Sequence, residues 1–236
     1  MKWLSISRLL MLGLVFTPMI FTLSIMSNEA KTIEQRLQEY GKTARSRMKP
    51  FFERADVPYP PQQLIFLGLK AERLLQVYAR AGTNSYHFIR SYPILAASGG
   101  PGPKLREGDR QVPEGIYPIE SLNPNSRYHL SLRIGYPNAF DRAQAAKETR
   151  THLGGDIMIH GSSVSIGCLA MGDEAAEDLF VLAADTGLKN ITVILSPMDF
   201  RTNATIPNAD SLPPWTASLY TQIKSRLTEL PRDQSR

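Results

Sequence analysis

The longest apolar run in the chain lies at its N-terminus. Lys2 and Arg8 precede an almost uninterrupted apolar stretch from Leu9 to Met26, and polar sequence begins at Asn28. A basic head before such a stretch is typical of an export signal, and this stretch is also long enough to be an uncleaved membrane anchor. We therefore expect residues 1–27 to be a signal peptide or anchor. The rest of the chain is expected in the periplasm, either soluble after cleavage or attached to the inner membrane.

A helical pattern follows the apolar run. Residues 31–56 are rich in Glu, Gln, Arg and Lys, and Ile33, Leu37 and Tyr40 recur at helical spacing. Three prolines at positions 58, 60 and 61 then break the pattern. This predicts a helical linker over residues 28–61 that leads away from the membrane, and a domain boundary at its end.

The remainder of the chain alternates between short β-type runs and turns. Only residues 174–186 read as a strong helix in this part, with Asp173 as the expected N-terminal cap and Gly187 as the C-terminal cap. A further amphipathic helix is expected over residues 215–230. We predict a mostly β domain over residues 62–198 with one important helix, and a C-terminal extension over residues 199–236. The predicted strands are 63–69, 74–80, 86–97, 115–119, 129–134, 156–160 and 191–195.

Length and charge narrow the possible functions. The 236 residues suffice for one sizeable domain with extensions. The net charge of +5 suits an anionic polymer, a membrane surface or nucleic acid. The chain has no basic block, zinc-finger spacing or aromatic–basic RNA motif, so we expect no nucleic-acid partner.

The single cysteine of the chain carries the candidate chemistry. An exported protein with one cysteine forms no internal disulfide, so Cys168 is either inert in the core or chemically employed. An apolar run ends at His160, a loop rich in Gly and Ser follows, and Cys168 comes shortly before the predicted helix. The positive end of that helix would favour a thiolate, and His160 would take the thiol proton. The N–H groups of Gly167 and Cys168 are expected to hold a developing oxyanion.

Two other interpretations of these residues stay open. Cys168 and His160 are a packed, inert pair in one of them. In the other, His152, His160 and Cys168 bind zinc, although their spacing matches no recurring zinc pattern. We expect neither a metal nor an organic cofactor.

His-Gly followed by Ser-x-Gly-Cys and a helix resembles the active-site signature of the L,D-transpeptidase (YkuD) catalytic domain family. Residues 74–78 resemble an early strand of that family, and residues 112–117 its Pro-x-Gly-x-aromatic segment. The resemblance covers residues 62–198. It implies a β-sandwich or barrel-like fold with one active-site helix. It also implies Cys168 as nucleophile and His160 as base, with Gly161, Ser165 and Gly167 supporting the loop and the oxyanion.

The chain departs from the usual family pattern at two positions. Ile166 stands where most members have a histidine, and Ala170 where most have an arginine. Residues 102–110 and 134–142 resemble the YafK/DpaA subgroup, which is associated with release of the outer-membrane lipoprotein from peptidoglycan. This implies hydrolysis of an amide bond at diaminopimelate. The alternatives are a transpeptidase that forms crosslinks or attaches lipoprotein, and an inactive wall-binding module.

Several residues are candidates for binding the peptidoglycan stem peptide, the expected partner, or a lipoprotein linked to it. Arginine binds carboxylates with two hydrogen bonds, and a Gly-Tyr-Pro-Asn turn can line a cleft. The candidates are Arg110, Arg127, Arg142, Tyr136 and Asn138, with Arg106 and Arg133 as further arginines.

Overall fold

A computed structural model describes residues 30–202, 205–206 and 209–233, and the expected export segment at residues 1–27 lies outside them. Eight strands form one sheet in the order β3-β2-β1-β8-β4-β5-β6-β7. Strand β1 is parallel to β8 and β6 is parallel to β7, whereas the other neighbours are antiparallel. The strands are β1 (Gln63–Leu69), β2 (Leu74–Arg80), β3 (His87–Pro93), β4 (Gly115–Ser126), β5 (His129–Ile134), β6 (Met158–His160), β7 (Leu169–Ala170) and β8 (Ile191–Ser196).

The two ends of this sheet are linked to each other. Ala96, just beyond β3, forms a bridge with Ala170 of β7. The N–H of Leu95 donates to the carbonyl of Ala170 at 2.8 Å, and the N–H of Ala170 donates to the carbonyl of Ala96 at 2.9 Å. The sheet therefore curls until β7, at one end of the strand order, meets the segment that follows β3, at the other end.

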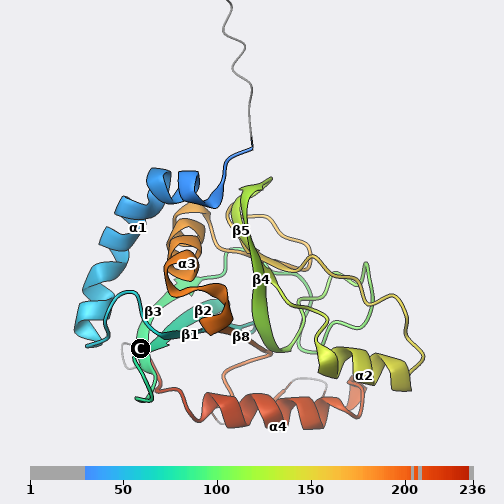
Figure 1. The fold of residues 1–236 in the computed structure, drawn as a ribbon. Coiled ribbons are helices and arrows are strands. Elements are labelled where there is room, and N and C mark those ends of the chain that lie inside the picture. Colours follow the sequence, from blue (N-terminus) through green and yellow to red (C-terminus); the bar gives the residue numbers. More distant parts are fainter. Residues whose placement is uncertain (1–29, 203–204, 207–208, 234–236) are drawn as a thin grey trace, which may run out of the picture.

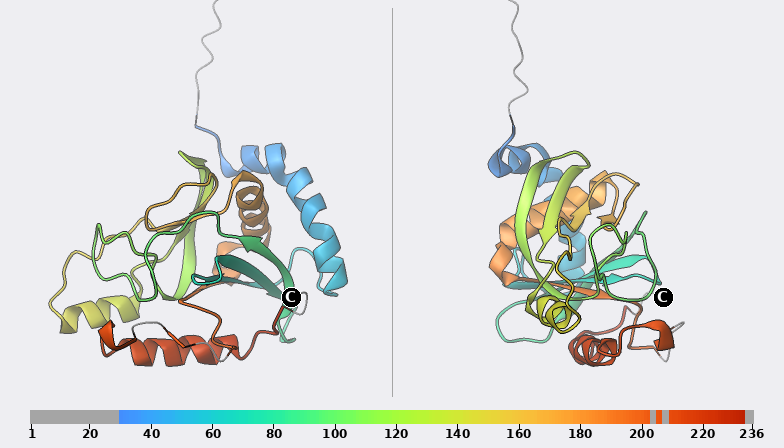
Figure 2. Two further views of the ribbon diagram at one scale, coloured as in Figure 1. Left: turned by 180° about the vertical axis from the view of Figure 1, so that it is seen from behind. Right: turned by 90° about the vertical axis from the view of Figure 1, so that its right-hand side faces the viewer.

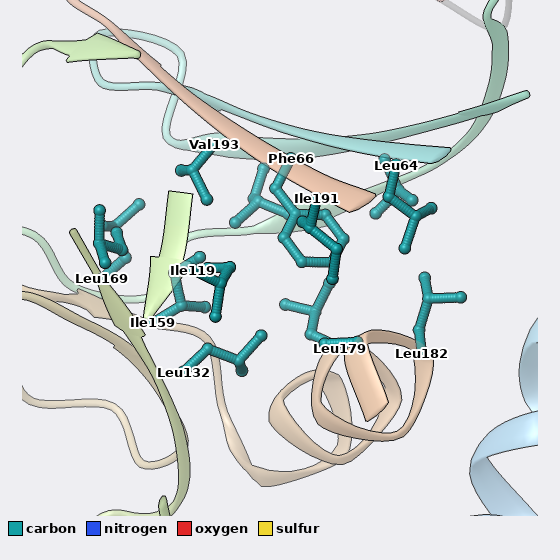
Figure 3. Close-up of a cluster of buried hydrophobic side chains, with 14 of the residues drawn as sticks. Leu64, Phe66, Ile119, Leu132, Ile159, Leu169, Leu179, Leu182, Ile191 and Val193 are labelled. Carbon is teal, nitrogen blue, oxygen red and sulfur yellow. The ribbon is translucent and has the colours of Figure 1, made fainter. Parts of the chain in front are cut away.

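The sheet buries both of its faces, which explains the continuous apolar runs of β1 and β8. Leu64 and Phe66 of β1 belong to the core on one side, together with Leu179 and Leu182 of α3 (Asp173–Thr186), as Figure 3 shows. The alternate residues of β1 face the other way, toward α4 (Thr216–Leu227), which lies along the opposite side (Figure 1). A strand that is covered on both faces loses the apolar–polar alternation of a half-exposed strand.

Helix α1 (Ile33–Arg54) packs on the domain instead of leading away from it. It lies beside α3 in Figures 1 and 2, and its residues Met48 and Phe52 are buried in the core that α3 shares. The Arg47 guanidinium lies 2.8 Å from the Asp178 carboxylate and 2.9 Å from that of Glu177, both on α3. The expectation of a linker or stalk is therefore wrong for the described part of residues 28–61.

The mostly β description also needs correction. The fold is mixed α/β, because α1 and α3 cover one face of the sheet and α4 the other. Helix α2 (Ala139–Lys147), which the sequence pattern did not reveal, lies close to α4, and the Phe140 and Trp215 rings are 5.9 Å apart. Within the described residues, no helix has the length and apolarity needed to cross a membrane.

Candidate active site

The pairing of two short parallel strands brings the predicted pair together. Strand β6 ends at His160, the chain loops through residues 161–168, and β7 then returns beside β6 with Ala170 opposite His160. Cys168 directly precedes β7. Both side chains line one pocket of about 210 Å³, with Tyr128, Val164, Ser165 and Ile166 as the other lining residues.

The tautomer of His160 follows from its backbone contact. Its Nδ1 lies 2.6 Å from the carbonyl oxygen of Gly161, which can only accept, so Nδ1 carries the hydrogen. The neutral ring then has a free lone pair on Nε2. Burial lowers the pKa of His160, and the Gly161 carbonyl opposes this only partly. The ring is therefore a neutral base at neutral pH.

The aromatic ring of Tyr128 lies against this imidazole. The two ring centroids are 4.7 Å apart and the planes are inclined by 31°, which is a tilted arrangement. Tyr128 belongs to the turn between β4 and β5 and is partly exposed. Its ring covers one face of the imidazole and forms part of the pocket rim.

Within the part of the chain that the structure describes, both hydrogen-bond partners of Cys168 Sγ are backbone groups. The N–H of Met158 donates to Sγ at 3.4 Å, and Sγ lies 3.6 Å from the carbonyl oxygen of Asp156. Burial raises the pKa of the thiol, the Met158 N–H lowers it, the Asp156 carboxylate raises it, and the Lys104 charge lowers it. The net direction is upward, so the expectation of a resting thiolate is wrong. The strand β7 separates Cys168 from the first turn of α3 along the chain, and burial dominates.

The loop backbone before the cysteine is held by two hydroxyl groups. The N–H of Gly167 donates to Ser98 Oγ at 2.6 Å, and the N–H of Cys168 donates to Ser165 Oγ at 3.1 Å. Ser165 Oγ thus holds the backbone N–H of the cysteine. The two N–H groups expected to hold an oxyanion are engaged in this state, so an oxyanion has to replace the hydroxyl oxygens as their acceptor.

Gly161 is required by the close approach of three other groups. A Cβ at this position would lie 2.6 Å from Asp173 Oδ1, 2.7 Å from the Tyr128 carbonyl oxygen and 2.9 Å from the His129 Cβ. The Asp173 carboxylate accepts from the N–H of Ser162 at 2.7 Å, so it holds the start of the loop. The predicted helix cap is therefore wrong, because Gly172 occupies the N-cap position without a side-chain hydrogen bond. Gly187 does end the helix, as predicted.

Two predicted substrate-binding residues have structural contacts instead. Tyr136 is buried, and its hydroxyl donates to the carbonyl of Lys104 at 3.2 Å. Asn138 caps α2, because its side chain accepts from the N–H of Asp141. Neither residue lines the pocket at Cys168. Both residues thus stabilise the fold around a segment that the sequence alone suggested to be a turn.

The predicted arginines lie in different surroundings. Arg110 and Arg127 are exposed. Arg106 and Arg142 line two larger cavities of about 680 and 660 Å³, which also share His152. Arg133 pairs with Asp156, the residue whose carbonyl oxygen contacts the thiol.

His152 also lies apart from the other two residues of the possible zinc set. It lines the larger cavities, whereas His160 and Cys168 line the small pocket. Among the described residues, no group of three or more His, Cys, Asp or Glu side chains is placed to hold a metal ion.

Sequence reasoning did not single out Ser98, Tyr128 and Asp156. Ser98 and Asp156 act through contacts between segments distant in the chain, and no local pattern marks such contacts. Tyr128 directly precedes β5, and an exposed aromatic ring in the turn between two strands is a signal that the sequence offered.

Comparison with known proteins gives matches that include the segment with His160 and Cys168. A sequence model of the L,D-transpeptidase catalytic domain, YkuD, matches residues 62–194. YafK of Escherichia coli K12, named as a candidate L,D-transpeptidase, is 43% identical over 113 residues, which are 47% of this chain and 43% of YafK. The chain thus matches less than half the length of this curated relative.

Two solved structures align with parts of this chain at TM-scores below 0.5. The helical cell shape determining protein Pgp2 of Campylobacter jejuni has a TM-score of 0.48 at 22% identity, covering 71% of this chain and 56% of Pgp2. L,D-transpeptidase 1 of Mycobacterium tuberculosis has a TM-score of 0.32 at 16% identity, covering 57% and 62% of the two chains. Because the family match spans more than half of the 236 residues, the chain belongs to the L,D-transpeptidase catalytic domain (YkuD) family.

Proposed function

We propose that this protein is an exported, cysteine-dependent peptidoglycan amidase with Cys168 as nucleophile and His160 as general base. Its substrate is an amide bond at diaminopimelate in a peptidoglycan stem peptide, and its product is lipoprotein released from the wall. The proposal rests above all on one observation. The only thiol of the chain and an imidazole with a free Nε2 line the same small pocket.

The two side chains supply every proton transfer that the reaction needs. Nε2 of His160 takes the Cys168 proton as the sulfur attacks the amide carbonyl, and then gives that proton to the departing amine as the C–N bond breaks. A thioester remains on Cys168. Water attacks it with His160 as base, which yields the carboxylic acid and restores the thiol.

The choice of water as the acceptor of the acyl group is supported by sequence resemblance rather than by the geometry of the site. Residues 102–110 and 134–142 resemble the YafK/DpaA subgroup, and Ala170 stands where most family members have an arginine. An amine acceptor would instead make the enzyme a transpeptidase. The proposed location on the outer side of the inner membrane follows from the apolar segment at residues 9–26.

The test uses the full-length protein, purified in detergent and incubated with peptidoglycan that carries covalently linked lipoprotein. We expect mass spectrometry to show stem peptides that have lost their lipoprotein remnant, without new crosslinked dimers. Cys168→Ala should abolish this release. Ser163→Ala, at an exposed serine of the same loop, is the matched control and should retain it.

Three outcomes would contradict the proposal. New crosslinked dimers would identify a transpeptidase. Unchanged release by Cys168→Ala would exclude Cys168 as nucleophile. A wild-type protein that binds the wall but leaves every amide intact would favour a silent binding module.

A further inference from the structure

Among the described residues, Asp156 and Lys104 are the charged groups that act on the Cys168 thiol, and Ala170 stands where most family members have an arginine. Ala170, two residues after the cysteine, is fully buried in β7, and its backbone is bonded to the chain beyond β3. Lys104 is also buried, and its Nζ is engaged by Asp109 at 2.6 Å and by the Arg106 carbonyl at 2.8 Å. Neither residue can offer a positive charge to a ligand that enters the pocket from solvent.

Arg133 differs from both because its guanidinium reaches solvent. Its side chain is 41% exposed, and it pairs with Asp156 Oδ1 at 2.7 Å and with Glu120 Oε2 at 3.2 Å. On the strand ladder it lies opposite Met158, whose N–H donates to Cys168 Sγ. The pairing of β5 with β6 thereby places Arg133 beside the residue whose N–H contacts the nucleophile.

Asp156 joins the arginine to the thiol. Its carbonyl oxygen is the one that lies 3.6 Å from Sγ, while its carboxylate is 76% exposed and holds the Arg133 guanidinium. The two contacts belong to one residue, so a single residue, Asp156, connects the guanidinium with the reacting sulfur. Exposed ion pairs of this kind contribute little net stability, so an incoming carboxylate can take the place of Asp156 at low cost.

We propose that Arg133 is the anchor for a carboxylate of the substrate adjacent to the scissile carbonyl, and that Asp156 holds the guanidinium while the site is empty. This inference rests on the proposed function for the identity of the substrate. Arginine suits the role because its planar fork donates two parallel hydrogen bonds to a carboxylate. The Asp156 side chain is then a competitor of the substrate, and its removal favours binding.

The test measures binding separately from turnover. Two synthetic stem peptides share the same scissile amide, and they carry either a free carboxylate or a carboxamide next to it. Isothermal titration of the full-length Cys168→Ala protein should show a roughly ten- to hundredfold tighter Kd for the carboxylate peptide, the range expected of hydrogen bonds to charged groups. Adding Arg133→Met should remove this preference and leave the Kd of the carboxamide peptide unchanged.

The partner variant should act in the opposite direction. Adding Asp156→Asn should tighten binding of the carboxylate peptide several-fold, because the arginine loses the nearer of its two competing anions and keeps only Glu120. The control is Arg226→Met on α4, which removes a partly exposed arginine that pairs with Glu229 at 3.1 Å, and it should change neither Kd. Thermal unfolding of each variant confirms that the protein is folded.

Equal Kd values for the two peptides in the Cys168→Ala background would overturn the inference. So would an Arg133→Met change that weakens both peptides alike. The proposed function fails in a different way: the wild-type protein would keep its preference for the carboxylate peptide and cleave neither peptide.

Discussion

Burial moves the pKa values of Cys168 and His160 in opposite directions. The thiol pKa is raised and the imidazole pKa is lowered, so both groups are neutral over the range between them. A neutral pair exchanges its proton only when the sulfur attacks. The ion pair then forms in the pocket together with the new bond, rather than in the empty enzyme.

Alkylation of Cys168 by iodoacetamide tests this neutral resting state. Because the thiolate is the reactive form, we expect the rate to rise with a midpoint above the ordinary pKa of cysteine. Asp156→Asn should lower the midpoint, since the Asp156 carboxylate raises the thiol pKa. Glu120→Gln removes the other carboxylate on Arg133 and serves as control. The chain has one cysteine, so mass spectrometry reads its modification directly. A midpoint at or below the ordinary value would contradict the prediction.

Tyr128 should keep water from one face of the His160 imidazole. Tyr128→Ala hydrates the ring, which raises its pKa and moves the acid limb of the kcat/KM profile to higher pH. The contact between the two rings is worth about 1 kcal/mol, so we also expect roughly a fivefold to tenfold loss of activity. Tyr128→Phe retains the ring and should keep the wild-type acid limb. An unchanged acid limb in Tyr128→Ala would show that the ring does not shield the base.

At the scale of elements, helix α2 contains a buried carboxylate, Asp141, whose ionised form destabilises the folded protein. Burial raises the pKa of Asp141 to about 6, and the N–H of Asn138 offsets this only in part. The folded protein therefore binds this proton more tightly than the unfolded chain. The cost of burying the ionised group grows as the pH rises from about 4 to about 6 and is complete above that range.

Asp141→Asn should remove this pH-dependent cost. The amide has no charge, and its oxygen can still accept from the Asn138 N–H. We expect the unfolding free energy of the variant to gain on that of the wild type between pH 4 and pH 7, by up to about 3 kcal/mol. Urea denaturation at several pH values measures the difference. Asp56→Asn, at an exposed position, should show no such trend. A constant difference between Asp141→Asn and wild type would contradict the prediction.

The strands show where sequence patterns suffice and where they do not. The predicted bounds of β1, β2 and β5 agree with the structure, because apolar runs between turn residues define them locally. The two-residue strand β7 has no such signal, since it exists through its bonds to β6 and to Ala96. Helix α2 was missed because Asn138, its cap, stands in a segment that also reads as a turn.

The same limit applies to the site. Cys168 and His160 were recognisable because a strand end, a glycine-containing loop and a lone cysteine occur together in the sequence. The state of the thiol was not recognisable, because burial and the partners of Sγ depend on the folded chain. The hydroxyl group that accepts from the Gly167 N–H was not recognisable either, since Ser98 lies 69 residues away from Gly167.

At the scale of the whole molecule, α1 belongs to the cooperative unit of the domain. Its Phe52 is buried, with its ring 5.1 Å from that of Tyr59. Phe52→Ala should lower the unfolding free energy by about 3 to 5 kcal/mol, measured by denaturant titration. Lys49→Ala, on the exposed side of the same helix, should change it by less than about 0.5 kcal/mol. A small effect of Phe52→Ala would instead indicate that α1 is a detachable arm.

The bridge between Ala96 and Ala170 has a consequence for the motions of the molecule. Met171 donates its N–H to the His160 carbonyl and Ala170 donates to Ala96, so both amides are locked where the curled sheet meets itself. Breaking the Ala170 bond parts the two ends of the sheet, and breaking the Met171 bond parts β7 from β6. We expect both amide hydrogens to exchange with deuterium only through global unfolding, while those of the exposed Ser163 and Val164 exchange by local fluctuation. The backbone that directly follows the nucleophile would then be as rigid as the fold itself. Any adaptation to ligands would take place in the loop just before Cys168.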